Sequence, residues 1–288
     1  MQSDTASLFQ HYTDILRANG LAARSIENYL YSLKGFTRFL GERPLHGASA
    51  DDVVAYQISI AATGGSDSTI RVATYALRAF LRLVLERDDW NDARLPKPRG
   101  PQRLPEILSS DEVQAILDAA PSPKHRAAFM LCYGSGLRTE ELLHLEPRHV
   151  DSKRMVLRVE QGKGRKDRPV VLPHTILAEL RDCWRRYRPQ RYLFEGRRPG
   201  QPMAATTLQR AFRTALHKAG IHKRVTPRSM RHAFATHLVE QGTPLRVVQT
   251  LLGHKSLNTT AVYTHLAQTW LTEVKSPLDS LKDAKPRS

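Results

Sequence analysis

The sequence predicts a mainly α-helical protein with a small antiparallel β-sheet, an α+β chain of two domains. Apolar residues recur at helical spacing through the first 90 residues, and two short β-like runs flank a glycine-containing turn in the second half. A proline-rich stretch separates the two parts. We therefore expect a helical domain at 1–90, a linker at 91–106, a second domain at 107–275 and a tail at 276–288.

The first domain is predicted to be all-helical, because no proline interrupts its four periodic segments. These segments cover residues 7–20, 25–41, 48–62 and 66–87. Ser25 is a suitable N-cap for the second segment, and Ser49 precedes acidic residues at the start of the third. The second segment also carries one apolar stripe. The stripe consists of Ile26, Tyr29, Leu30, Leu33, Phe36 and Leu40.

The boundary between the domains is predicted from composition. Residues 91–108 read NDARLPKPRGPQRLPEIL and contain four prolines and one glycine. Proline fixes φ and lacks a backbone donor, so this stretch is a poor helix or strand. We expect it to be an extended linker.

The second domain is predicted to mix helices with one hairpin. The helices are expected at residues 109–120, 123–136, 177–188, 206–220, 226–242 and 243–253. The last two share a pattern, with Thr as N-cap, Pro at the first helical position and Gly past the end. Residues 154–160 and 167–173 are β-like, and the intervening QGKGRK predicts a hairpin turn.

The charge of the chain points to a polyanionic partner. The formal net charge is +16, and the isoelectric point is near 10.2. Residues 1–100 carry 12 Lys and Arg against 11 Asp and Glu, whereas residues 101–288 carry 32 against 17. Nucleic acid is the first expectation. An acidic membrane surface is a weaker alternative, because no single amphipathic helix holds the positive cluster.

Other compositional features indicate an intracellular protein. No run of about 18 apolar residues is present, so no membrane span is expected. Cys132 and Cys183 are the two cysteines of the chain, too few for a disulfide framework, and we expect both to be reduced. These features favour a cytoplasmic, nucleoid-associated location.

The helix that opens at Thr226 carries a candidate phosphate site. At about 100° per residue, Arg228, Arg231 and His232 fall on one face, away from the apolar residues expected in the core. The N-terminus of a helix also favours an anion. The alternative is an ordinary solvated basic face.

Two further basic residues stand at unusual positions. Arg138 opens a helix in GSGLRTEELLHL, where it opposes the helix dipole, so it is expected to have a ligand or a carboxylate partner such as Glu141. Lys163 lies between glycines at the tip of the predicted hairpin. It is either a solvated turn residue or a mobile acid that protonates a leaving alkoxide.

Metal-binding patterns are missing from the sequence. It contains no HExxH, no CxxC, no P-loop and no acidic cluster suited to two magnesium ions, and His232 and His237 are five apart. We therefore expect no metal and no cofactor. Cationic side chains would have to supply any stabilisation of phosphoryl chemistry.

Five residues occur in the order and spacing typical of one enzyme family. They are Arg138 in GLRTEELLHL, Lys163 in GKGRKDRPV, Arg231 in MRHAFATHL, and His254 and Tyr263 in LLGHKSLNTTAVYTHL. In these motifs the chain resembles the tyrosine recombinases, most closely the phage-integrase and XerC/XerD branch. The resemblance covers almost the whole chain. It implies a helical core-binding domain followed by a catalytic domain.

The resemblance implies a role for each matching residue. Tyr263 would be the nucleophile that attacks a DNA phosphodiester, leaving a 3′-phosphotyrosine and a free 5′-hydroxyl. Arg138 and Arg231 would hold the non-bridging oxygens, His254 would hydrogen-bond the phosphate and Lys163 would protonate the leaving oxygen.

Supporting roles and partners follow from the same resemblance. Glu141 would steady the active-site arginine, and the hairpin residues Lys163, Arg165 and Lys166 would contact DNA. The implied substrate is double-stranded DNA with inverted half-sites, bound by a homo-tetramer in synapsis, with accessory DNA-bending proteins as further partners. The implied reaction is the integration, excision or resolution of DNA, as in mobile elements.

Arg228 departs from the family pattern, which usually has histidine three residues before the second arginine. Arginine cannot accept a proton at ordinary pH, so the tyrosine proton would have to leave to water or through another group. Three rival functions stay open. They are a type IB topoisomerase, which shares this chemistry, a catalytically weak DNA-binding protein and a metal-dependent nuclease.

Overall fold

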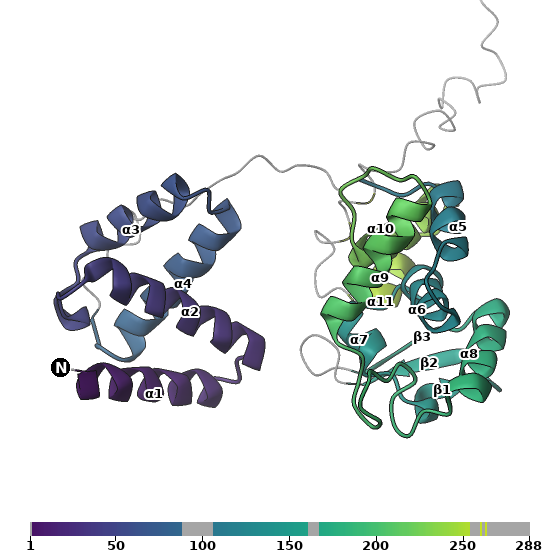
Figure 1. Ribbon diagram of the computed structural model, residues 1–288, viewed down its shortest axis with the longest axis horizontal. Coiled ribbons are helices and arrows are strands. Elements are labelled where there is room, and N and C mark those ends of the chain that lie inside the picture. Colours follow the sequence, from purple (N-terminus) through teal and green to yellow (C-terminus); the bar gives the residue numbers. More distant parts are fainter. Residues whose placement is uncertain (1, 88–105, 161–166, 254–259, 261–262, 264–288) are drawn as a thin grey trace, which may run out of the picture. The chain divides into compact units, whose positions relative to one another are not determined.

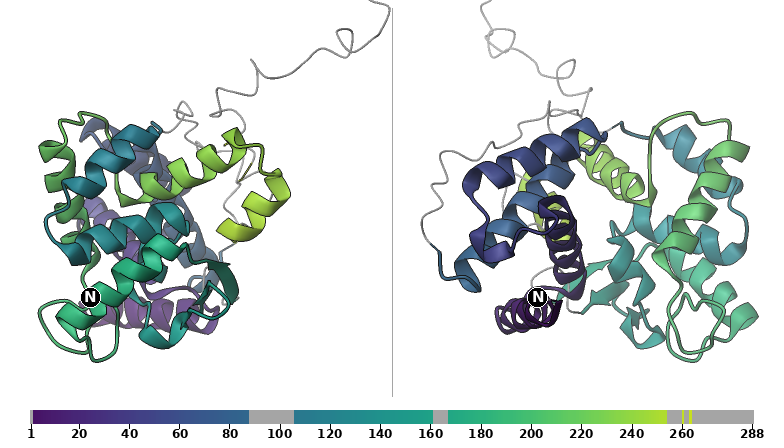
Figure 2. Two further views of the ribbon diagram at one scale, coloured as in Figure 1. Left: turned by 90° about the vertical axis from the view of Figure 1, so that its right-hand side faces the viewer. Right: turned by 60° about the vertical axis from the view of Figure 1, so that its left-hand side comes forward.

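The computed structural model describes residues 2–87, 106–160, 167–253, 260 and 263. By its internal contacts the chain divides into two compact units, Met1–Arg103 and Leu104–Ser288. Figure 1 and Figure 2 show that the first unit is built of helices, whereas the second combines helices with a small sheet. The predicted fold class, mainly α with a small antiparallel sheet, is confirmed.

The first unit contains four α-helices in its described part. They are α1 (Gln2–Ala18), α2 (Ala23–Leu40), α3 (Ala50–Ala62) and α4 (Asp67–Leu83), with a 3-10 turn at Leu45–Gly47. The predicted stripe of α2 faces the core, where Leu33 and Phe36 are fully enclosed. Tyr12 of α1 packs edge-on against Phe80, and its hydroxyl donates a hydrogen bond to the carbonyl of Ala76 at 2.7 Å.

Two helix starts in this unit test the predicted caps. Ser49 caps α3 as predicted, because its side chain accepts a hydrogen bond from the backbone N–H of Asp52. The predicted cap at Ser25 is wrong. The backbone N–H of Ser25 already donates to the carbonyl of Ala22 at 2.8 Å, so the first turn closes earlier and α2 begins at Ala23.

The second unit combines helices with a three-stranded sheet that lies toward one end of the unit (Figure 1). The helices are α5 (Ser110–Asp118), α6 (Pro123–Gly134), α7 (Thr139–Leu143), α8 (His174–Tyr187), α9 (Ala205–Lys218), α10 (Pro227–Glu240) and α11 (Leu245–Leu252), with a 3-10 turn at Pro147–His149. The strands are β1 (Val150–Asp151), β2 (Val156–Val159) and β3 (Arg168–Val171). They follow the order β1-β2-β3, and both pairs are antiparallel. The hairpin formed by β2 and β3 is confirmed, whereas the two-residue β1 is too short to give a period-2 pattern.

The core of the second unit positions the candidate site. Leu157 and Val170, paired across β2 and β3, are buried in a large cluster that includes Phe129 of α6 and Phe212 of α9. A smaller cluster joins α10, α11 and the isolated described residue Tyr263. None of the described helices has the length and apolar character needed to cross a membrane.

The start of α11 differs by one residue from the prediction. Pro244 is the N-cap, with extended ψ of 135°, and Leu245 is the first helical residue. The end agrees with the prediction, because Gly253 takes the left-handed conformation with φ of 62°. Gly253 therefore ends α11 at the point where three arginine side chains donate hydrogen bonds to the last carbonyls of the helix.

Candidate active site

A buried carboxylate lies at the centre of the candidate site. Glu141 of α7 is only 5% exposed at its side chain. Its Oε1 accepts a hydrogen bond from Nη1 of Arg138 at 2.6 Å. Arg168, the first residue of β3, donates to both carboxylate oxygens of Glu141 at 2.8 Å. Glu141 therefore ties the start of α7 to the sheet by charge-assisted hydrogen bonds.

The electrostatics of Glu141 favour its ionised form. Burial alone would raise the pKa of this carboxyl, but the hydrogen bonds from Arg168 and from the backbone of Arg138 outweigh burial and lower it to about 2. Glu141 is therefore an anion throughout the neutral range. It offsets part of the positive charge that gathers around it.

Arg138 was expected to have a ligand or a carboxylate partner. Its carboxylate partner is Glu141. Its backbone N–H also donates to Oε2 of Glu141 at 2.9 Å. Its Nη2 donates to the carbonyls of Leu252 and Gly253 at 3.2 and 3.1 Å. A quarter of the side chain stays exposed, so the guanidinium can still reach a bound anion.

Arg231 is almost fully buried, which corrects the expectation that it lies on an exposed face of α10. Its Nη1 donates to the carbonyl of Gly136, and its Nη2 donates to the carbonyl of Leu252 at 2.6 Å. Burial and the nearby charge of Arg138 lower the pKa of Arg231 to about 9. Carbonyl acceptors in the turn before α7 and at the end of α11 make this burial tolerable.

The C-terminal end of α11 is the point where three arginines converge. Arg138 and Arg231 both donate to the carbonyl of Leu252, and Nε of Arg168 donates to the carbonyl of Leu251 at 3.3 Å. The last carbonyls of a helix lack intrahelical partners and carry partial negative charge. The end of α11 therefore helps to hold three cations close together, and Arg138, Arg168 and Arg231 are called the arginine cluster below.

Tyr263 lies beside this cluster and is 3% exposed. It packs in the apolar cluster with Phe234, Val248 and Leu252. Burial raises the pKa of Tyr263, while the charges of three arginines act in the opposite direction. These are Arg231, Arg228 and Arg138. The hydroxyl of Tyr263 is 3.0 Å from Nδ1 of His232, within hydrogen-bond distance.

The residues of the first turns of α10 differ in exposure. Arg228 is exposed, Arg231 is buried and His232 is half-buried. Burial, followed by the charges of Arg228 and Arg231, lowers the pKa of His232 to about 4. His232 is therefore a neutral imidazole near pH 7, and Arg228 is close enough to influence it.

Several predicted site residues lie outside the described part of the chain. These are Lys163, Arg165, Lys166 and His254. Their roles stay predictions. The described residues bring together Arg138, Glu141, Arg231 and Tyr263, and the charge of Arg228 also acts on Tyr263.

Sequence reasoning missed one member of the site, Arg168, and one contact, that of His232 with Tyr263. Arg168 is part of the hairpin motif GKGRKDRPV, but no spacing rule connects it with Glu141, which is 27 residues away. His232 directly follows Arg231, and this position gave no sign of a contact with Tyr263, which is 31 residues away. Both contacts depend on how the elements of the second unit pack.

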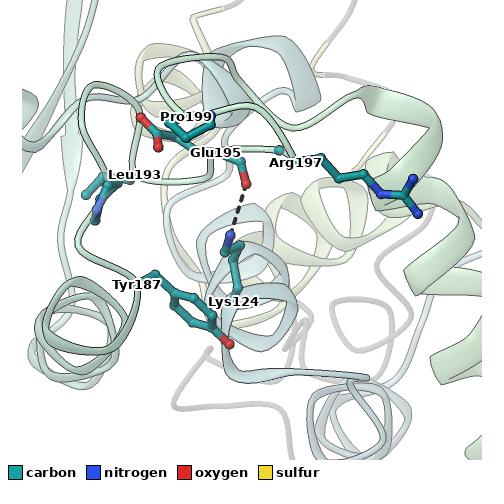
Figure 3. Close-up of a pocket in the computed structure, with 8 residues that line it drawn as sticks. Lys124, Tyr187, Leu193, Glu195, Arg197 and Pro199 are labelled. Atoms are coloured by element: carbon teal, nitrogen blue, oxygen red, sulfur yellow. Dashed lines mark hydrogen bonds between the residues drawn. The ribbon is translucent and has the colours of Figure 1, made fainter.

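A surface pocket at another place in the second unit is separate from this cluster (Figure 3). Its lining includes Lys124, which donates to the carbonyl of Glu195 at 3.0 Å and lies over the ring of Tyr187 at 4.6 Å. None of its lining residues belongs to the arginine cluster.

Among the described residues, no group of three His, Cys, Asp or Glu side chains is arranged to hold a metal ion.

Comparison with known proteins assigns the class. Residues 106–269 match the phage integrase family, and residues 8–92 match the SAM-like N-terminal domain of phage integrases. The chain therefore belongs to the phage integrase family, the tyrosine recombinases. Membership of this family implies DNA cleavage and rejoining.

Individual relatives match over nearly the whole chain. The putative integrase/recombinase y4qK of Sinorhizobium fredii is 41% identical over 282 residues, which is 97% of this chain and 91% of the relative. The tyrosine recombinase XerA of Pyrococcus furiosus is 33% identical over 273 residues, 93% of this chain and 92% of XerA. The fold matches that of the Tn1549 transposon integrase in complex with circular intermediate DNA, with a TM-score of 0.71, 20% identity, and coverage of 89% and 94%.

Proposed function

We propose that this protein is a site-specific recombinase that cuts and rejoins duplex DNA through a 3′-phosphotyrosine at Tyr263. One observation carries the proposal. Tyr263 is buried beside the arginine cluster; burial raises its pKa, and the charges of Arg231, Arg228 and Arg138 counter part of that rise. A tyrosine in such surroundings is suited to nucleophilic attack on an anionic phosphodiester.

The arginine cluster would stabilise the transition state. The attack places extra negative charge on the non-bridging oxygens of the phosphate, and Arg138 and Arg231 would face these oxygens with planar donors. Glu141 and the carbonyls at the end of α11 would keep both guanidinium groups in place before DNA binds. Preorganised charge of this kind does not have to be assembled during the reaction.

The remaining chemistry is assigned to residues outside the described part. Lys163 would protonate the leaving 5′-oxygen, and His254 would hydrogen-bond the phosphate. Arg165 and Lys166, with Lys163, would contact DNA. Because the phosphotyrosine conserves the energy of the broken bond, rejoining would need no ATP, and the arginines would replace a metal ion as the stabilising charge.

The proposal extends to the organisation of the chain on DNA. Residues 1–90 would form the core-binding domain, 91–106 the linker, 107–275 the catalytic domain and 276–288 a tail. The substrate would be a pair of inverted half-sites held in a tetramer, with accessory DNA-bending proteins, in the cytoplasm at the nucleoid. The Tn1549 integrase was captured with circular intermediate DNA, which supports a mobile-element reaction here.

The experiment starts from DNA that flanks the gene of this protein. Footprinting locates the bound site, and a nicked suicide version of that site then traps cleavage, because the short strand that carries the free 5′-hydroxyl diffuses away. We expect wild-type protein to form an adduct that resists detergent, in EDTA and without ATP, whereas Tyr263→Phe binds the site and forms none. An adduct in the Phe variant would overturn the assignment, and plasmid relaxation without strand exchange would favour a topoisomerase.

A further inference from the structure

His232 contacts the one hydroxyl that the proposed reaction must deprotonate. Its Nδ1 lies 3.0 Å from Oη of Tyr263, and the two rings are tilted at 45° with centroids 5.8 Å apart. The tyrosine ring is packed in the apolar cluster formed with α10 and α11, and His232 projects from α10 itself. The contact therefore joins a tyrosine packed in the core of the second unit to a half-buried histidine of α10.

We propose that His232 is the general base that removes the proton of Tyr263 during cleavage and returns it during rejoining. This inference rests on the proposed function, because it assumes that Tyr263 is the nucleophile. It assigns to His232 the task that Arg228 cannot perform. The two residues are four apart on α10, so they lie one turn apart on the same side of the helix.

The surroundings of His232 keep its acceptor nitrogen free of a proton. The charged and titratable groups that act on it are Arg228, Arg231 and Tyr263. Burial first, and then both arginines, disfavour an imidazolium, so the ring is neutral and Nδ1 can accept the hydrogen bond of the tyrosine hydroxyl. In this arrangement the ring proton resides on Nε2.

Binding of DNA would make His232 a stronger base. A phosphodiester placed against Arg231 and Arg228 brings a negative charge next to the two cations that lower the pKa of His232. This added charge favours the imidazolium, and the charge that develops at the phosphate during attack favours it further. The histidine would thus accept a proton in the loaded site and remain neutral in the free protein.

Each proton that moves in the proposed step has a donor and an acceptor. As the bond between Oη of Tyr263 and phosphorus forms, the hydroxyl proton moves to Nδ1 of His232. The bond between phosphorus and the 5′-oxygen breaks, and this oxygen takes a proton from Lys163 in the proposed function. In rejoining the 5′-hydroxyl attacks, its proton returns to the lysine, and the proton on Nδ1 returns to the tyrosine oxygen.

The test measures single-turnover cleavage of the nicked suicide site between pH 6 and 10. His232→Asn can still hydrogen-bond the tyrosine but cannot act as a base. We expect its cleavage rate at pH 7 to fall about 10²–10⁴-fold, the range for general-base catalysis. The cleavage rate of the variant should recover as pH rises, because hydroxide then ionises Tyr263. The affinity of the variant for DNA should differ from that of the wild type by less than about twofold. Added imidazole should partly restore cleavage in His232→Ala.

A second histidine of α10 provides a matched control. His237 makes the same kind of contact, with Nδ1 2.9 Å from the hydroxyl of Tyr133. Because this contact does not involve Tyr263, His237→Asn should cleave at close to the wild-type rate with an unchanged pH profile.

The outcomes separate this inference from the proposed function. Wild-type cleavage by His232→Asn would show that the contact only positions Tyr263, and loss of DNA binding together with cleavage would make His232 a structural residue. Either result overturns the base assignment. An adduct that persists in Tyr263→Phe would instead overturn the proposed function.

Discussion

Glu141 holds the arginine cluster together, because its two oxygens accept hydrogen bonds from both Arg138 and Arg168. Glu141→Gln keeps the shape of the side chain but removes the charge, which leaves the nearby arginines without compensation. Removing one partner of a buried ion pair is strongly destabilising, so we expect a loss of about 3 kcal/mol in the free energy of unfolding. Urea unfolding measures this loss.

The control for this variant is its neighbour on α7. Glu140 is 76% exposed at its side chain, so Glu140→Gln should change the free energy of unfolding by less than about 0.5 kcal/mol. Equal effects of the two substitutions would contradict the central position of Glu141.

Glu141 should also change how the free energy of unfolding depends on pH. Its pKa is about 2 in the folded protein against an ordinary value of 4.5, so the unfolded chain binds its proton more tightly. The stabilisation is therefore present above pH 4.5 and is lost as the pH falls from 4.5 to 2. Across this range the wild type should lose more stability than Glu141→Gln. Parallel profiles from urea unfolding would refute this expectation.

At the scale of elements, the side chain of Arg168 packs closely against the glycine that ends α11. Gly253 has φ of 62°, and a Cβ there would lie 2.8 Å from Cδ of Arg168. Gly253→Ala should therefore displace an arginine that Glu141 holds, in addition to straining the backbone. We expect covalent adduct formation to fall at least tenfold.

Gly242 is the matched control for Gly253. Its φ is 78°, and a Cβ there would meet nothing within 4 Å. Gly242→Ala should carry the backbone strain alone, about 1–2 kcal/mol, and keep its cleavage rate. If both alanine variants cleave equally well, the packing of Arg168 against the end of α11 has no part in the reaction.

The elements themselves were largely predictable from local signals. Ser49 and Thr226 mark helix starts in agreement with the structure, because caps and apolar periods act over a few residues. The site was predictable only in part. The burial of Arg231 depends on carbonyls of Gly136 and Leu252, which are distant in sequence, and a helical wheel contains no information on such acceptors.

At the scale of the whole molecule, positive charge is concentrated in residues 101–288. Phosphate contacts release counterions, so DNA affinity should fall steeply with salt. We expect about 10³-fold weaker binding between 50 and 200 mM salt if six or more phosphates are contacted. Fluorescence anisotropy with a labelled duplex measures this dependence. A flat salt profile would argue against a phosphate-dominated interface.

Mapping the covalent link between protein and DNA tests the central claim most directly. After reaction with the nicked suicide site, the adduct is digested with protease and nuclease, and the modified peptide is sequenced by mass spectrometry. We expect a nucleotide joined through its 3′-phosphate to the peptide that contains Tyr263, with a free 5′-hydroxyl on the released strand. A link to any other residue, or through a 5′-phosphate, would contradict this claim.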